Sequence, residues 1–246
     1  MLITSLVVSL NQLLPIAILL VLLQVFAKQS AHHIWICLMV GVAMSFLYMY
    51  SALWASQWFD HKGLEYIQIA MCIAIFIAVL VFVIQQSVTA FNFAIITTIV
   101  MYLSHYVIYL NSFWKNSDAA ESLFIGTFLG SGICLSFCVL LYFFMSGVKH
   151  RFGNYPILIL IALNSASKLL GALDLASQID LITNTNPIWD LRHWISEHSE
   201  LGRVLRALIG YEATPDLTTV LTYIASTALF LIFCYVIPAS ISKERV

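Results

Sequence analysis

Polar side chains recur at helical spacing within an otherwise apolar stretch near residues 155–176. They are Asn164, Ser167, Lys168, Gly171 and Asp174. At 100° per residue, these positions fall within about a third of a helix circumference. An ionised lysine or aspartate in hydrocarbon is costly unless it faces protein or water. The stripe therefore predicts a helix face turned toward the bundle interior or a cavity, and a buried network that fixes helix packing is the alternative interpretation.

Two other apolar stretches carry groups that could bind a cation. Asn11 and Gln12 stand before Pro15, which lacks an amide donor and can kink a helix. Ser104 precedes His105, the only histidine well inside an apolar stretch, although a hydrogen-bonded packing role is the alternative for it.

The elements that carry these residues have the length of membrane spans. The chain is 61% hydrophobic and 9% charged, with a mean hydropathy of +0.95, and a bilayer core of ~30 Å needs ~20 apolar residues of helix. We expect an all-α polytopic membrane protein of about seven transmembrane helices. The third of them begins with Glu65 near its outer end. The spans are expected at about 6–26, 33–55, 64–85, 88–110, 122–145, 155–176 and 217–238.

The connection before the last span is expected to contain a further helix. Apolar residues recur at helical spacing from Trp189 to Leu208, opposite a charged face, which predicts an amphipathic helix lying at the membrane surface. Pro215 is expected at the first position of the last helix, with Asp216 near the positive end of the helix dipole.

Loop charges predict the orientation. One side of the bundle holds Lys62 and Lys115 in its short loops, and the other holds more basic residues, so the second side is expected in the cytoplasm. The second set comprises Lys28, Lys149, Arg151, Lys243 and Arg245. The amino terminus then faces out, the carboxyl terminus is cytoplasmic, and the outer surface is acidic. A bacterial inner membrane is the expected location.

Several function classes find no support in the sequence. With a net charge of −1, the chain has no excess of basic residues of the kind that binds nucleic acid. It contains no nucleophile elbow, phosphate loop or H-E-x-x-H motif that would predict an enzyme. Cys134 and Cys138 stand one turn apart, a spacing we interpret as packing. Gly126 and Gly130 form a G-x-x-x-G pattern on the same span, which predicts close helix contact. Beyond the lipid bilayer, oligomerisation and a periplasmic partner are left open.

The chain resembles the oxidase-coupled iron permeases, the family of fungal high-affinity iron permeases and the bacterial elemental-iron uptake permease. The similarity extends over essentially the whole chain and includes Gly63-Leu64-Glu65. Its strongest motifs are Trp189-Asp190, Leu201-Gly202 with Leu205, Leu208-Ile209-Gly210-Tyr211, Pro215 and Tyr223. The resemblance implies two inverted three-helix repeats, at 1–86 and 87–177. It further implies an outer loop with an amphipathic helix at 178–216, then a last helix and cytoplasmic tail at 217–246.

The chain departs from this family at the residues thought to bind iron. The family carries an R-E-x-x-E motif in the first and fourth spans. The aligned positions here begin at Asn11-Gln12 and at Ser104-His105, and end at Pro15 and Ile108. Ferric iron needs anionic oxygen ligands, so amides and one imidazole are a weak replacement for four carboxylates.

Three functions follow from this departure. The first is a permease with an altered ion site that transports iron or another divalent metal as its substrate, because imidazole and amide ligands suit a divalent ion. Its candidate metal ligands, at and near the positions aligned with the family motifs, are Gln12, His105, Asn11, Ser104 and Asp174. The second is a transport-inactive pseudo-permease subunit that docks a periplasmic metal-binding or redox protein. The third is a haem or quinone electron-transfer subunit, which is disfavoured because a bis-histidine haem needs two suitably placed intramembrane histidines. No resident cofactor is predicted with certainty.

Overall fold

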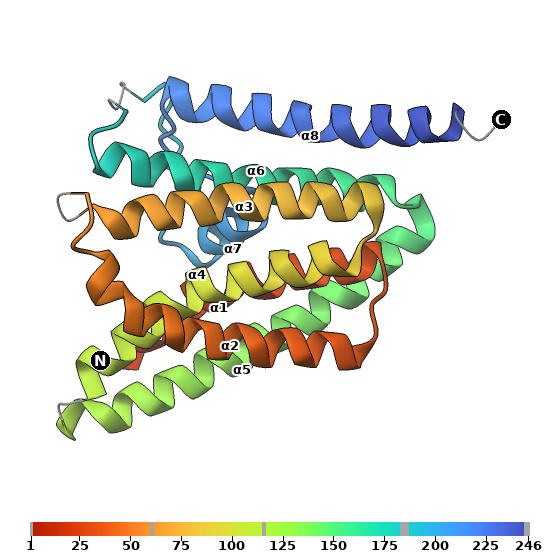
Figure 1. Cartoon of the computed structure of the whole chain (residues 1–246). Helices are drawn as coiled ribbons and strands as arrows, with labels where there is room; N and C mark the ends of the chain where they lie inside the picture. The colour runs from red at the N-terminus through yellow and green to blue at the C-terminus, as the bar shows by residue number, and fades with distance from the viewer. Residues whose placement is uncertain (1, 60–61, 115–116, 183–186, 244–246) are drawn as a thin grey trace. The chain divides into compact units, whose positions relative to one another are not determined.

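The chain forms long α-helices in the computed structural model, which describes residues 2–59, 62–114, 117–182 and 187–243 (Figure 1). In these ranges the helices are α1 (Leu2–Phe26), α2 (Ala31–Ala55), α3 (Gly63–Gln85), α4 (Val88–Trp114), α5 (Ser117–Phe152), α6 (Tyr155–Gln178), α7 (Glu200–Ile209) and α8 (Leu217–Lys243). All except α7 are long and apolar enough to cross a membrane. The predicted polytopic all-α fold is thus confirmed. Lys115 and Arg245, which enter the charge comparison, lie outside the described residues.

The helices form two compact units. Unit one comprises Met1–Ser56 and Ile95–Ile157, and unit two comprises Gln57–Ala94 and Leu158–Val246. Each unit therefore takes helices from both of the expected repeats, so the units and the repeats divide the chain differently.

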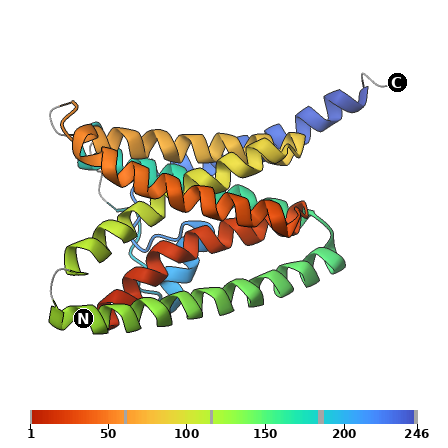
Figure 2. The same cartoon turned by 60° about the horizontal axis from the view of Figure 1, so that its bottom comes forward.

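In unit one, α1 and α5 lie side by side (Figures 1 and 2). Gly130 of α5 makes this possible, because a Cβ there would lie 2.6 Å from the Cβ of Ser9 and 3.2 Å from the carbonyl oxygen of Leu6. The close helix contact predicted for Gly130 is confirmed. The hydroxyl of Ser9 in turn hydrogen-bonds the hydroxyl of Tyr106 on α4, at 2.9 Å.

The carboxyl end of α1 is capped by a lysine of α5. Lys149 donates from Nζ to the carbonyl oxygens of Val25, at 2.6 Å, and Phe26, at 3.0 Å. A cation at this end satisfies unpaired carbonyls and complements the helix dipole. Lys149 and Arg151, expected in a loop, lie in the last turn of α5, which continues to Phe152.

In unit two, α3 and α6 run antiparallel. Lys62, at the start of α3, donates to the carbonyl oxygen of Ile179, just beyond α6, at 2.8 Å. Two to three turns farther along the pair, Cys72 of α3 approaches Gly171 of α6, where a Cβ would lie 3.9 Å from the Cys72 sulfur.

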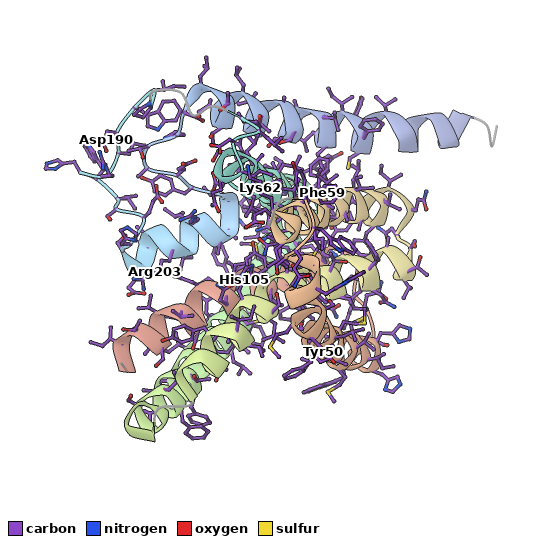
Figure 3. The ribbon with its side chains drawn as sticks, turned by 60° about the vertical axis from the view of Figure 1, so that its left-hand side comes forward. Tyr50, Phe59, Lys62, His105, Asp190 and Arg203 are labelled. Carbon is purple, nitrogen blue, oxygen red and sulfur yellow. The ribbon has the colours of Figure 1, made fainter. Side chains whose placement is uncertain are left out.

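Large apolar side chains cover much of the outside of the helices. Tyr50 of α2 projects into open space in Figure 3 and is 83% exposed. Phe128 and Leu140 of α5 are each 70% exposed. In water such surfaces would be unfavourable, whereas lipid tails match them, which agrees with the membrane-spanning fold.

Candidate functional site

The polar stripe of α6 is buried at Asn164 and Lys168 and becomes more exposed toward Asp174. Asn164 is fully buried, and Lys168 is 3% exposed. The prediction that Lys168 faces the interior is confirmed. Asp174, nearer the end of α6, has a half-exposed side chain that lies 4.0 Å from the guanidinium of Arg206 on α7.

The stripe holds the carboxyl end of α7. The side-chain amide of Asn164 donates to the carbonyl oxygens of Ala207, at 2.8 Å, and Leu208, at 3.0 Å. The hydroxyl of Tyr223 on α8 donates to the next carbonyl, that of Ile209, at 2.5 Å. Carbonyls in the last turn of a helix lack partners within the helix, so these donors complete their hydrogen bonding.

The main chain turns sharply just after these carbonyls. Gly210 ends α7 with φ +71°, and its amide donates to the carbonyl oxygen of Arg206 at 2.9 Å. This left-handed conformation favours glycine because it has no Cβ.

The end of α7 lies at the middle of the span, not at the membrane surface. Asn164 precedes Gln178, the last residue of α6, by 14 residues, which is about 21 Å of helix. α7 thus runs along α6 from the Gln178 end and stops beside the middle of that span, which is the geometry of a re-entrant helix and differs from the expected position on the membrane surface.

The helix is also shorter than expected, because residues from Trp189 onward form turns. The amide of Leu191 donates to the carbonyl oxygen of Ala213 at 2.8 Å. Asp190 accepts from the amide of Arg192 at 3.0 Å, and Figure 3 shows Asp190 on the outlying part of this connection. α7 starts only after Ser199, whose hydroxyl accepts from the amide of Gly202 at 3.0 Å.

The start of α8 differs from the expected one by a short distance. Asp216 is the cap, because its carboxylate accepts from the amide of Thr219 at 2.9 Å, and the helix begins at Leu217. Pro215 therefore precedes the cap and is not the first helical residue.

Five charged side chains gather where α7 meets the end of α6, and we call them the charged cluster. The cluster comprises Asp174, Glu197, Arg206, Glu212 and Asp216. Arg206 lies 3.4 Å from Glu197, whose other carboxylate oxygen accepts from the amide of Ala213 at 2.8 Å. Burial, together with the negative charges of Asp174, Glu197 and Asp216, raises the pKa of Glu212 to about 7, although Arg206 opposes the shift.

Four of the candidate metal ligands lie in unit one. Asn11 and His105 are exposed, Gln12 is half-buried, and Ser104 is buried, with its hydroxyl donating to the carbonyl oxygen of Met101 at 3.1 Å. No hydrogen bond joins Gln12 to His105 among the described residues. The link between α1 and α4 is instead the Ser9–Tyr106 hydrogen bond, one helical turn from Gln12 and adjacent to His105.

Two further sequence expectations concern Pro15 and Asp174. Pro15 is buried within an α1 that is helical throughout. Asp174 belongs to unit two, so a site that combines it with the unit-one ligands stays a prediction. Within the described part of the chain, His, Cys, Asp and Glu side chains form no group of three or more that could hold a metal ion.

Among the described residues of unit two, the buried polar atoms without a hydrogen-bond partner include one carboxylate oxygen of Glu65, in the first turn of α3, and the amide oxygen of Asn164. Sequence reasoning identified both residues and named Tyr223 as part of a family motif, but it did not predict the contact of Tyr223 with α7 or any role for Arg206 and Glu212, which complete the surroundings of α7. For Tyr223 the available signal was a phenol within an apolar span, which needs a hydrogen-bond acceptor when buried.

Comparison with protein-family models, with curated proteins and with solved structures finds no match to this chain. Its place among the iron permeases therefore remains a proposal based on the motifs described above.

Proposed function

We propose that the chain is a membrane transporter related to the iron permeases, with a divalent metal cation as its substrate. The observation that carries this proposal is the re-entrant helix α7, whose carbonyl end meets the polar stripe of α6 at the middle of the span.

Such a helix is costly to place in a membrane. Its end leaves backbone groups that lipid cannot satisfy, so irregular backbone at this depth is found where protein covers it or where it borders a water-filled path. Transporters use interrupted helices in this way, and the negative carboxyl ends of half-helices attract cations.

The substrate is argued from the candidate ligands. Gln12 and His105 would supply an amide oxygen and an imidazole nitrogen, which suit a divalent ion such as ferrous, manganous or zinc. The Ser9–Tyr106 bond between α1 and α4 supports this pairing, because it brings the neighbouring turns of the two helices together.

Uptake of ferrous, manganous and zinc ions into proteoliposomes tests the proposal, together with calorimetric titration of the same ions. His105→Ala should abolish binding and uptake, whereas His150→Ala, at an exposed position in the last turn of α5, should change neither. Binding should weaken as pH falls, because a histidine must be neutral to bind a metal. Absence of binding by all three ions would refute the metal site.

A second candidate is favoured by the burial of Lys168. A positive charge held within the span opposes the passage of a cation, because charges interact strongly at low dielectric constant. This fits a transport-inactive pseudo-permease that docks a periplasmic metal-binding or redox protein. In that case the wild-type protein would neither bind nor transport metal, and His105→Ala would leave partner docking unchanged.

A further inference from the structure

We propose that α7 is a movable gate, held shut by hydrogen bonds from Asn164 and Tyr223. This inference rests on the proposed transport function and assigns two residues that keep the path closed from the Gln178 end of α6.

The bonds that hold α7 are few and lie at one end. Asn164 and Tyr223 together donate to three consecutive carbonyls, those of Ala207, Leu208 and Ile209. These acceptors belong to the main chain, so the two donors hold the end of α7 together with the ion pair between its Arg206 side chain and Asp174 of α6.

The remainder of α7 is weakly packed. Gly202 is its one buried residue, and Leu201 is 58% exposed. By contrast, Leu19, Leu22 and Leu23 of α1 are fully buried. A helix with so little buried apolar surface is held mainly by its polar contacts, and such elements open at low cost.

The polar stripe of α6 lies next to the end of α7 that Asn164 and Tyr223 hold. Gly210 contacts Ser167, so that a Cβ on Gly210 would lie 2.5 Å from the Ser167 Cβ, and the next residue is the buried Lys168. Movement of α7 away from α6 would admit water to Ser167 first. In the closed state, α7 shields the middle of the span from water at the Gln178 end of α6.

A cysteine at position 167 can report this movement. In a variant whose five native cysteines are replaced by serine, Ser167→Cys is labelled in proteoliposomes with a charged, membrane-impermeant methanethiosulfonate. A second reporter, Gln178→Cys, occupies the exposed end of α6 and should label rapidly in every background.

Labelling at position 167 should be slow with Asn164 and Tyr223 intact. Asn164→Ala and Tyr223→Phe should each accelerate it at least tenfold, and the double variant should accelerate it further. Ser165→Ala is the matched control, because Ser165 is equally buried in α6 but its hydroxyl has no hydrogen-bond partner in the described part of the chain. Labelling of position 167 should stay slow in this variant.

Tyr223→Phe removes a single oxygen atom, so it keeps the test decisive if Asn164→Ala fails to fold. Unchanged labelling in folded Tyr223→Phe, or rapid labelling with both donors intact, would overturn the gate. Faster labelling in the donor variants, with no metal uptake by any variant, would keep the movable helix and overturn the transport proposal instead.

Discussion

Gly210 lies directly on Ser167, with no room between them for a methyl group. Gly210→Ala would place its Cβ 2.5 Å from the Cβ of Ser167 while holding φ at +71°. Gly153 is a matched control, because it has φ +77° and a Cβ added there would lie within 4 Å of none of the described residues.

We expect Gly153→Ala to destabilise the protein by about 1 kcal/mol, the cost of the left-handed backbone alone. Gly210→Ala should cost about 1–3 kcal/mol more because of overpacking against Ser167. Thermal unfolding in detergent measures both. Equal losses would mean that α7 does not rest on α6 as described.

A second glycine pair tests the contact between α1 and α5. Gly130→Ala should destabilise unit one by about 1–3 kcal/mol, because the new Cβ would overlap Ser9. At Gly132, two residues along the same helix, an added Cβ would lie within 4 Å of none of the described residues. Gly132→Ala should be neutral or slightly stabilising, since alanine favours helix. The difference between their unfolding midpoints is the measurement, and its absence would argue against the close contact.

Glu212 should make stability depend on pH. Its folded-state pKa of about 7 exceeds the ordinary 4.5, so the folded protein favours the neutral carboxyl. The contribution of Glu212 to the free energy of unfolding should therefore be greatest below about pH 4.5 and should fall as the pH rises toward 7.

Glu212→Gln should remove that decline, which chemical unfolding at a series of pH values would detect. The control is Glu200→Gln, an exposed residue of α7, which should retain the wild-type slope. An unaltered slope in Glu212→Gln would assign the pH dependence to another group.

Orientation is the remaining prediction. The charge bias places the carboxyl terminus in the cytoplasm and α7 on the outer side. In a cysteine-free background, His198→Cys should react with an impermeant reagent in intact cells, whereas Val246→Cys should react only after the cells are broken. The opposite pattern would invert the topology, and α7 would then enter from the cytoplasm.

The spans were predictable from sequence, because hydrocarbon imposes length and apolar composition on every helix that crosses it. Burial of Lys168 was predictable for the same reason. The turns at Trp189–Ser199 were not, although their apolar spacing favours a helix. Asp190 bonds the nearby backbone, and Leu191 pairs with the distant Ala213, so side-chain capping and tertiary contact override periodicity.

The depth of α7 was hidden for a different reason. Asn164 donates to the backbone carbonyls of Ala207 and Leu208. Every residue has such a carbonyl, so the sequence does not show which ones Asn164 binds. The amide in the middle of a span showed that a partner was needed but not which residues would supply it.

Neither unit is built from one continuous piece of chain, and this sets an order for biogenesis. α1 leaves the ribosome long before Lys149, the residue that caps its last carbonyls. Lys149 follows one of these residues, Val25, by 124 residues. During that interval, the nascent helix must sit in the bilayer without its cap. The hydroxyl of Ser9 keeps a hydrogen bond during this interval, because it donates to the carbonyl oxygen of Ser5 on its own helix at 2.6 Å. Assembly of unit one is thus a late step of synthesis, completed only when α5 has been inserted.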